Sequence, residues 1–271
     1  MKINNIKPFS TAKFEKLNNF KNTFFKKVDS MSYRNQAKLV DEFVLLHPEV
    51  VPYRQIKPST TPVFWFDSSP NDIFRKYFQK TKIQEALKKD PEIASILEDY
   101  GLKPKIYMKN LNIEAQKHFK DTYYASLKLG KINNLTANER RELSLAALLH
   151  DIGKSLIPSS IIDKPGKLSD KEREIIDLHA ELGARILKTQ GLSQNIVNMV
   201  GLHHESCCNP KKAHNIPAQI LSVCDQYSAL SEKRAYKSGY SQNKVKGILE
   251  ENSEGKSLLN PDIVFQLINE S

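Results

Sequence analysis

The sequence has little cysteine and no long hydrophobic run. Its cysteines, Cys207, Cys208 and Cys224, are odd in number and clustered, which excludes a disulfide-stapled fold and fits a reducing compartment. A membrane-spanning helix needs about 18 or more consecutive apolar residues, and Lys, Asp or His interrupts every candidate run. The first residues also lack the apolar block of a secretion signal. We therefore expect a cytoplasmic protein without a transmembrane segment.

The net charge of +10 belongs almost wholly to the N-terminal part of the chain. Residues 1–110 hold 20 Lys and Arg against 12 Asp and Glu, whereas residues 111–271 hold 21 against 19. A basic surface attracts nucleic acid or phosphorylated ligands, but no aromatic-interleaved basic motif or zinc-finger spacing accompanies it here. We interpret it as a solvated lysine-rich surface, and a nucleic-acid partner is not favoured.

Hydrophobic spacing predicts helices in the first 110 residues. Residues 12–28 have the pattern of an amphipathic helix, residues 51–70 form a proline-rich connector, and residues 72–100 return to a helical pattern. We predict that residues 1–110 are a basic, mainly helical domain that packs beside or regulates the rest. A homodimer or a protein partner through this domain is left open.

Residues 111–271 read as consecutive helices with clear boundaries, and strand-like alternation is scarce. The boundary signals are the capping boxes Thr136–Glu139 and Ser169–Glu172, a stop at Gly191, first-turn prolines at 217 and 261, and the cap Asn260. The simplest architecture is an all-α bundle.

Five of the seven histidines gather in or beside these helices: His118, His150, His179, His203 and His204. His179 lies among inward-facing apolar residues, and His150 closes the apolar run LSLAALL and is followed by Asp151. A buried imidazole or carboxylate without a partner costs on the order of 1–3 kcal/mol. Several such groups together therefore predict a shared partner.

A metal cluster is that partner, because imidazoles and carboxylates are the usual ligands of Fe, Mn, Zn and Ni. Asp151 could bridge two ions, and Asp225 adds a carboxylate inside an apolar helix. Glu114 precedes His118 by four positions, so both side chains share a helical face and Glu114 could reach an additional ion. Cys207 and Cys208 are adjacent rather than spaced for one tetrahedral ion with His214, so we interpret their segment as an exposed loop.

The stretch HDIGKSLIPSSIIDKPGKLSDKEREIIDLHAELGARIL, followed by HHE at 203–205, resembles the HD-domain phosphohydrolase superfamily and its HD-GYP branch of cyclic-dinucleotide phosphodiesterases. The similarity runs from about residue 114 to residue 240. It implies an HD-domain helical bundle over residues 111–271 with two or three divalent metal ions. The resemblance favours Fe or Mn as these ions. It also implies the ligands Glu114, His118, His150, Asp151, His179, His203, His204 and Asp225.

The resemblance further assigns Lys154 to the scissile phosphate and to catalysis beside Asp151. Arg234 and Lys237 match a basic pair that holds substrate phosphates. One segment departs from the pattern: where the family has a Gly-Tyr-Pro signature after HHE, this sequence has the shorter SCCNPKKAHNIPAQIL. That loss leaves the substrate and the partners open and removes no metal ligand.

The resulting hypothesis is a metal-dependent phosphodiesterase, in which a metal-bridging hydroxide attacks a phosphodiester in line. Cyclic di-GMP is the first substrate to test. Two alternatives remain: an HD-superfamily phosphohydrolase acting on another nucleotide or phosphate ester, and a non-catalytic cyclic-dinucleotide sensor or scaffold. The complete ligand set and the retained Lys154 favour catalysis.

Overall fold

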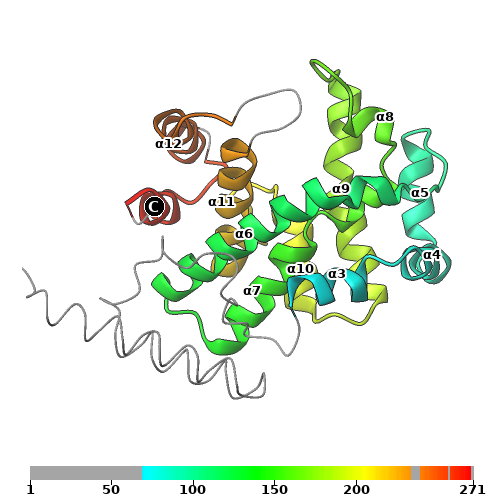
Figure 1. Ribbon diagram of the computed structural model, residues 1–271, viewed down its shortest axis with the longest axis horizontal. Helices are drawn as coiled ribbons and strands as arrows, with labels where there is room; N and C mark the ends of the chain where they lie inside the picture. The colour runs from blue at the N-terminus through cyan, green and yellow to red at the C-terminus, as the bar shows by residue number, and fades with distance from the viewer. Residues whose placement is uncertain (1–68, 233–238, 256, 270–271) are drawn as a thin grey trace, which may run out of the picture. The chain divides into compact units, whose positions relative to one another are not determined.

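The computed structural model describes residues 69–232, 239–255 and 257–269, and within them every regular element is helical (Figure 1). Residues Pro70–Ser271 form one compact unit, so the domain boundary expected at residue 110 falls inside it. The predictions for residues 12–28 and for the proline-rich connector up to residue 68 lie outside the described residues. No helix in the described part of the chain is long and apolar enough to cross a membrane.

The helix predicted over residues 72–100 is instead three short helices, α3 (Pro70–Tyr77), α4 (Lys80–Lys89) and α5 (Glu92–Asp99). The second break comes at Asp90, which is extended with φ −123° and ψ 92° and is followed by Pro91. A residue before proline is pushed out of the helical region, so the apolar spacing alone misled the prediction. The expected inward side chains Ile73, Ile83 and Leu97 are nevertheless buried.

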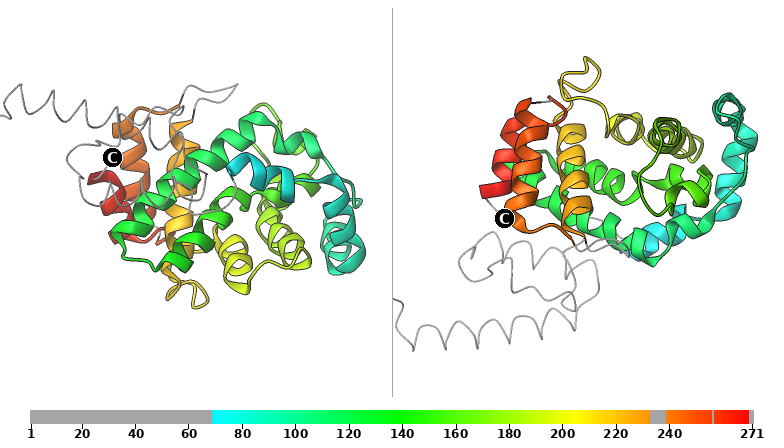
Figure 2. Two further views of the ribbon diagram at one scale, coloured as in Figure 1. Left: turned by 60° about the horizontal axis from the view of Figure 1, so that its bottom comes forward. Right: turned by 90° about the horizontal axis from the view of Figure 1, so that it is seen from above.

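The centre of the unit consists of long helices whose apolar faces meet. Helix α6 (Ile113–Ile132) packs against α7 (Ala137–Leu149) and α11 (Ile216–Ser231), and α9 (Asp170–Thr189) packs against α10 (Gln194–Leu202). Figure 2 shows α12 (Gln242–Glu250) and α13 (Pro261–Asn269) beside α11 at one end, with α4 and α5 at the other. A short π-helical turn, η4 (Glu251–Gly255), joins α12 to the last segment.

The helix boundaries predicted within residues 111–271 are confirmed. Both capping boxes are formed, with Thr136 and Ser169 each exchanging hydrogen bonds with the glutamate three residues on. Gly191 follows α9 with φ +78°, a conformation that glycine adopts without strain. Asn260 accepts hydrogen bonds from the first amides of α13, so local chemistry sets where these helices begin and end.

Three short elements link the long helices near the histidines: the 3-10 turns η2 (Met108–Leu111) and η3 (Ile152–Leu156), and α8 (Ser159–Ile162). The turn η3 follows α7 directly and packs tightly on α9. A Cβ added at Gly153 would lie 2.0 Å from the backbone oxygen of His179 and 2.6 Å from the nitrogen of Gly183. Only glycine permits this approach, which brings the end of α7 to the middle of α9.

Candidate metal centre

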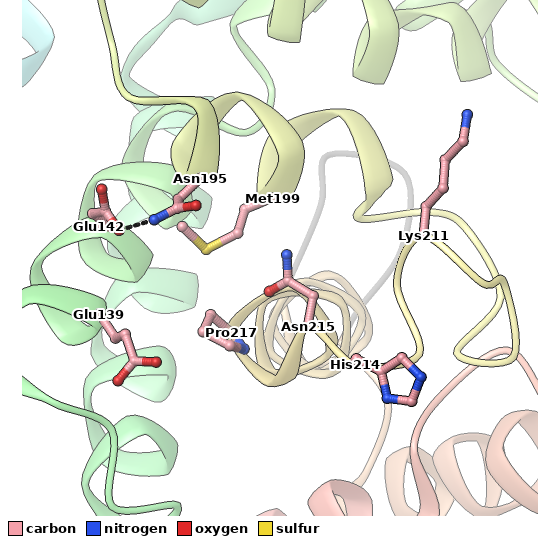
Figure 3. Close-up of a pocket in the computed structure, with 8 residues that line it drawn as sticks. All are labelled: Glu139, Glu142, Asn195, Met199, Lys211, His214, Asn215 and Pro217. Carbon is pink, nitrogen blue, oxygen red and sulfur yellow. Dashed lines mark hydrogen bonds between the residues drawn. The ribbon is translucent and has the colours of Figure 1, made fainter.

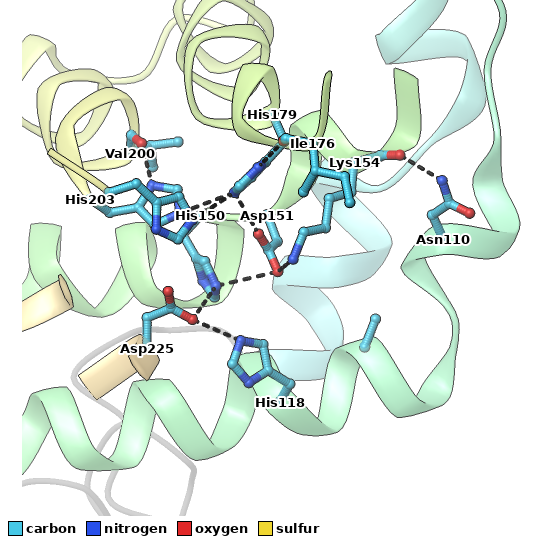
Figure 4. Close-up of polar contacts among 12 residues, drawn as sticks. Asn110, His118, His150, Asp151, Lys154, Ile176, His179, Val200, His203 and Asp225 are labelled. Atoms are coloured by element: carbon cyan, nitrogen blue, oxygen red, sulfur yellow. Dashed lines mark hydrogen bonds and ion pairs between the residues drawn. The ribbon is translucent and has the colours of Figure 1, made fainter. Parts of the chain in front are cut away.

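Six helical elements bring the predicted ligands to one place in the core (Figure 4). His118 comes from α6, His150 ends α7, and Asp151 begins η3. His179 lies in the middle of α9, His203 ends α10, and Asp225 comes from α11. These six residues are buried, and His204 lies at the exposed edge of the cluster.

In three of the histidines, a backbone carbonyl group one helical turn earlier determines which ring nitrogen carries the proton. The Nδ1 atoms of His150, His179 and His203 lie 2.9, 2.5 and 2.6 Å from the carbonyl oxygen three residues earlier. A carbonyl oxygen only accepts, so each Nδ1 carries the hydrogen and donates it. In the neutral ring the lone pair is then on Nε2, and in all three residues Nε2 points into the cluster.

Acceptor atoms crowd around one point in this arrangement. His179 Nε2 lies 3.2 Å from His203 Nε2, 3.1 Å from His204 Nε2 and 3.1 Å from Asp151 Oδ1. A proton on Nε2 of His179 could be donated in only one of these three contacts. A cation among the atoms would be shared by all of them, so the residues fit a divalent metal ion.

Asp151 and Asp225 divide the cluster into two groups of ligands. Asp225 Oδ1 lies 3.0 Å from His118 Nε2 and 3.4 Å from His150 Nε2, and these three residues form one group. His179, His203 and His204 form a second group, and Asp151 forms a third with His150 and His203, one residue from each of the first two. Asp151 lies between them, with Oδ1 facing His179 and Oδ2 3.5 Å from His150 Nε2. A carboxylate in this place can bridge two ions.

The protonation states suit metal binding. Burial opposes ionisation of Asp151, yet Lys154 and the neighbouring histidines hold its pKa well below the usual value. Asp225 likewise has a pKa well below the usual value, because its contacts with His118 and His150 outweigh its burial. Burial lowers the pKa of His203 strongly and that of His204 to about 4. The carboxylates are therefore ionised and these two imidazoles neutral, as metal ligands must be.

Among the described residues, Lys154 is the positively charged side chain that lies at this cluster. Its Nζ lies 2.6 Å from Asp151 Oδ2, and its side chain is 27% exposed. Because Asp151 is buried at the start of η3 and Lys154 is partly exposed, the ammonium group lies on the solvent side of the buried carboxylate. It is the group that an incoming anion would meet.

Not every predicted site residue joins the cluster. Glu114 is exposed in the first turn of α6 and belongs to none of the ligand groups found among the described residues. Arg234 and Lys237 lie outside the described residues. The thiols of Cys207 and Cys208 are 3.9 Å apart in the loop after α10, and no third ligand joins them in the described part of the chain.

Two supporting residues were not predicted from the sequence. Ser222 of α11 donates to the backbone oxygen of His203 at 2.5 Å and so fixes the end of α10. Asn110 of η2 donates to the backbone oxygen of Lys154 at 2.7 Å. Neither residue lies in a motif, and contacts between segments far apart in the chain leave no local pattern to detect.

A separate pocket of about 330 Å³ lies between the start of α7 and the loop before α11 (Figure 3). Glu142 there is bound by Ser193 and Asn195, and Asn215 caps α11 through Ala218. The polar groups of these residues thus serve helix ends. None of the cluster's ligands lines this pocket, so we place the functional site at the histidines. Its lining residues are Glu139, Glu142, Asn195, Met199, Lys211, His214, Asn215 and Pro217.

Comparison with known proteins identifies the family. The sequence model of the HD domain family matches residues 105–257, more than half of the chain, so the chain belongs to this family. The predicted all-α HD-domain fold is thereby confirmed.

Relatives with a named activity match part of the chain. A cyclic di-GMP phosphodiesterase of Pseudomonas aeruginosa is 37% identical over 108 residues, which are 37% of this chain and 26% of that protein. The 3'3'-cGAMP-specific phosphodiesterase 3 of Vibrio cholerae is 34% identical over 121 residues, 42% of this chain and 26% of that protein. A cyclic di-GMP phosphodiesterase of Thermotoga maritima is 27% identical over 191 residues, 67% of this chain and 48% of that protein. The chain thus matches less than half of the length of each.

Proposed function

We propose that the protein is a metal-dependent phosphodiesterase that hydrolyses a cyclic dinucleotide in the cytoplasm, with cyclic di-GMP as the first substrate to test. The observation that carries the proposal is the position of Asp151. Its two carboxylate oxygens face two separate ligand groups, and Lys154 stands beside it with part of its side chain exposed. Relatives named as cyclic-dinucleotide phosphodiesterases support the substrate class.

Two divalent ions, Fe or Mn, fit the ligands. His118, His150 and Asp225 would hold one, and His179, His203 and His204 the other, with Asp151 shared. Such ions polarise water and neutralise charge on phosphate oxygens. Glu114 is left as the proposed ligand of a third ion, from the exposed first turn of α6.

The chain's own residues prepare the site before a substrate arrives. The Nδ1 bonds of His150, His179 and His203 fix the ring orientation, so no rearrangement is needed to present Nε2. Burial keeps bulk water from Asp151 and strengthens its attraction to positive charge. Lys154 supplies an ammonium group that contacts a phosphate oxygen by a charge-assisted hydrogen bond.

Which dinucleotide the protein prefers depends on the residues that surround the metal ligands. In place of a Gly-Tyr-Pro signature, the chain has a loop containing the fully buried Lys212, whose Nζ donates to the backbone oxygen of Glu205. Arg234 and Lys237 remain the proposed contacts to the second phosphate. The first measurement must therefore compare several substrates.

The test is hydrolysis by protein purified anaerobically and supplied with Fe(II) or Mn(II), followed by chromatography. The panel contains cyclic di-GMP, 3'3'-cGAMP, cyclic di-AMP, a linear dinucleotide, mononucleotides and bis(4-nitrophenyl) phosphate. The inactive control carries His150→Ala with Asp151→Ala. His214→Ala, an exposed histidine outside the cluster, is the matched control for loss of an imidazole.

Turnover of cyclic di-GMP by the wild type and His214→Ala, but not by the double variant, supports the full proposal. Turnover of another panel member alone supports an HD phosphohydrolase with a different substrate. Metal binding without turnover of any member contradicts the catalytic proposal and favours the sensor.

A further inference from the structure

Asn110 is a buried residue whose amide bonds to the segment that follows Asp151, and Figure 4 shows its bond to the backbone oxygen of Lys154. Its Nδ2 donates to the backbone oxygens of Lys154 at 2.7 Å and of Ile157 at 2.8 Å. Its Oδ1 accepts from Ser159 Oγ at 2.6 Å. The two carbonyl oxygens can only accept, so they also fix which end of the amide faces them.

These bonds hold a segment that has little stability of its own. The turn η3 has only five residues, and 3-10 turns have weak hydrogen-bond geometry. Inside the turn, Lys154 N donates to the backbone oxygen of Asp151 at 2.9 Å. From outside the turn, Asn110 donates to the backbone oxygen of Lys154, and Tyr107 N donates to the backbone oxygen of Ser155 at 2.7 Å.

Asn110 also lies two residues before the N-cap of α6, the helix that carries His118. It therefore fastens the segment of Asp151 and Lys154 to the start of the helix that supplies a ligand to the other side of the cluster. Both N–H groups and the oxygen of its amide make bonds within the protein, so the side chain holds the backbone rather than a ligand or a substrate.

We propose that Asn110 is a positioning residue that sets the place of the Lys154 ammonium group at the cluster by holding the backbone carbonyls of Lys154 in η3 and of Ile157 directly after it. The importance of that place rests on the function proposed above. Without the amide, the segment from Lys154 to Ser159 loses three bonds to Asn110, and only the backbone bond from Tyr107 to Ser155 still holds η3 from outside. Lys154 then leaves Asp151 more often, and the ammonium group is less often where a phosphate would meet it.

The experiment compares Asn110→Ala with Asn133→Ala in the full chain. Asn133 also donates from its amide to two acceptors, the backbone oxygen of Leu129 at 2.9 Å and Gln266 Oε1 at 2.7 Å, but at the far end of α6. The first readout requires no catalysis: an amine-acylating reagent is applied briefly, and labelling of Lys154 is measured by mass spectrometry against the exposed Lys171. The second readout is kcat and KM with Mn(II) on the best substrate of the panel.

We expect Asn110→Ala to raise Lys154 labelling and to lower kcat by at least about tenfold with little change in KM, since small displacements at a reacting centre cost rate. Asn133→Ala should change neither beyond its effect on stability. If Asn110→Ala does not fold, Ser159→Ala replaces it, because it removes only the bond that Oδ1 accepts, and the same changes should be smaller.

A folded Asn110→Ala protein with wild-type Lys154 labelling overturns the inference, whatever the activity. Raised labelling with wild-type kcat overturns it as well, since Lys154 would then be displaced without consequence. If the wild type hydrolyses no panel member, the proposed function has failed, and the labelling experiment still decides whether Asn110 holds Lys154.

Discussion

Lys154 Nζ lies 2.6 Å from Asp151 Oδ2 in the turn that follows α7. Asp151 has a side chain only 3% exposed, whereas that of Lys154 is 27% exposed. The pair therefore connects a buried carboxylate, shared by two groups of ligands, to the side of the cluster that solvent reaches. The ammonium group stabilises the ionised carboxylate and still has donors left for a ligand, because a lysine carries three.

Replacing Lys154 by methionine should separate catalysis from metal binding. We expect Lys154→Met to lower kcat by about 10²–10³-fold, the typical effect of removing a group that stabilises developing charge. The histidines remain, so the Mn(II) content measured by elemental analysis should stay close to that of the wild type. Lys164→Met is the matched control, since Lys164 forms an exposed pair with Glu172 at 2.7 Å. Equal loss of metal and activity in Lys154→Met would show that the lysine supports only Asp151.

The two ligand groups predict different metal contents for different variants. His118→Ala removes a ligand from one group and His204→Ala from the other. Each substitution should therefore weaken the binding of one ion and leave the binding of the other unchanged. Asp151→Asn removes charge from both groups and should lower the affinity for both ions. Metal analysis after dialysis, with Mn(II) EPR for paired ions, measures this. If His118→Ala and His204→Ala each lose all metal, the cluster is a single cooperative site rather than two.

The sequence was sufficient where local chemistry decides the structure. The capping residues Thr136 and Ser169 and the stop at Gly191 satisfy helix ends with neighbouring groups, so their patterns are visible in a short stretch. The histidines could be recognised because several polar residues on apolar helix faces need a common partner. Glu114 was assigned by its spacing from His118 and by the family resemblance, and neither reveals whether the first turn of α6 is covered by another element.

Other features depend on contacts across the chain. Asn110 holds η3 across a separation of 44 residues, and no periodicity indicates such a bond. The helix expected over 72–100 failed for a local reason, since Pro91 forces Asp90 out of the helical region. Apolar spacing continued through that break because each of the three short helices buries one face.

Gly153 should tolerate no side chain. An alanine there places Cβ 2.0 Å from the backbone oxygen of His179, and neither backbone can move without shifting a ligand. We expect Gly153→Ala to destabilise the protein by roughly 3 kcal/mol or more, the upper range for overpacking, and to weaken metal binding. Urea unfolding and Mn(II) titration measure the two effects.

Gly247→Ala is the control for this substitution. Gly247 lies inside α12 with no atom within 4 Å of an added Cβ, so alanine should stabilise the helix by about 1 kcal/mol. A Gly153→Ala protein as stable as the wild type would show that η3 does not approach α9 as closely as the structure has it.

Lys212 predicts how stability changes at alkaline pH. The residue is fully buried in the loop that follows His203 and His204, and burial lowers its pKa to about 8 from the ordinary 10.5. Between these two values the unfolded chain binds a proton that the folded chain has released. Stability therefore rises with pH in that range, and below pH 8 the folded state bears the full cost of the buried charge. The shift corresponds to a rise of about 3 kcal/mol, as an order of magnitude.

Lys212→Met removes this titration and keeps the length of the side chain. The measurement is urea unfolding of both proteins from pH 7 to pH 10, plotted as the difference in the free energy of unfolding between wild type and variant. Other titrating groups are common to both proteins and cancel in this difference. We expect the stability of the wild type to increase relative to that of Lys212→Met as the pH rises above 8, because only the wild type loses a buried charge. A constant difference across the range would mean that the ammonium group is charged and satisfied in the folded protein, with the bond to Glu205 offsetting its burial.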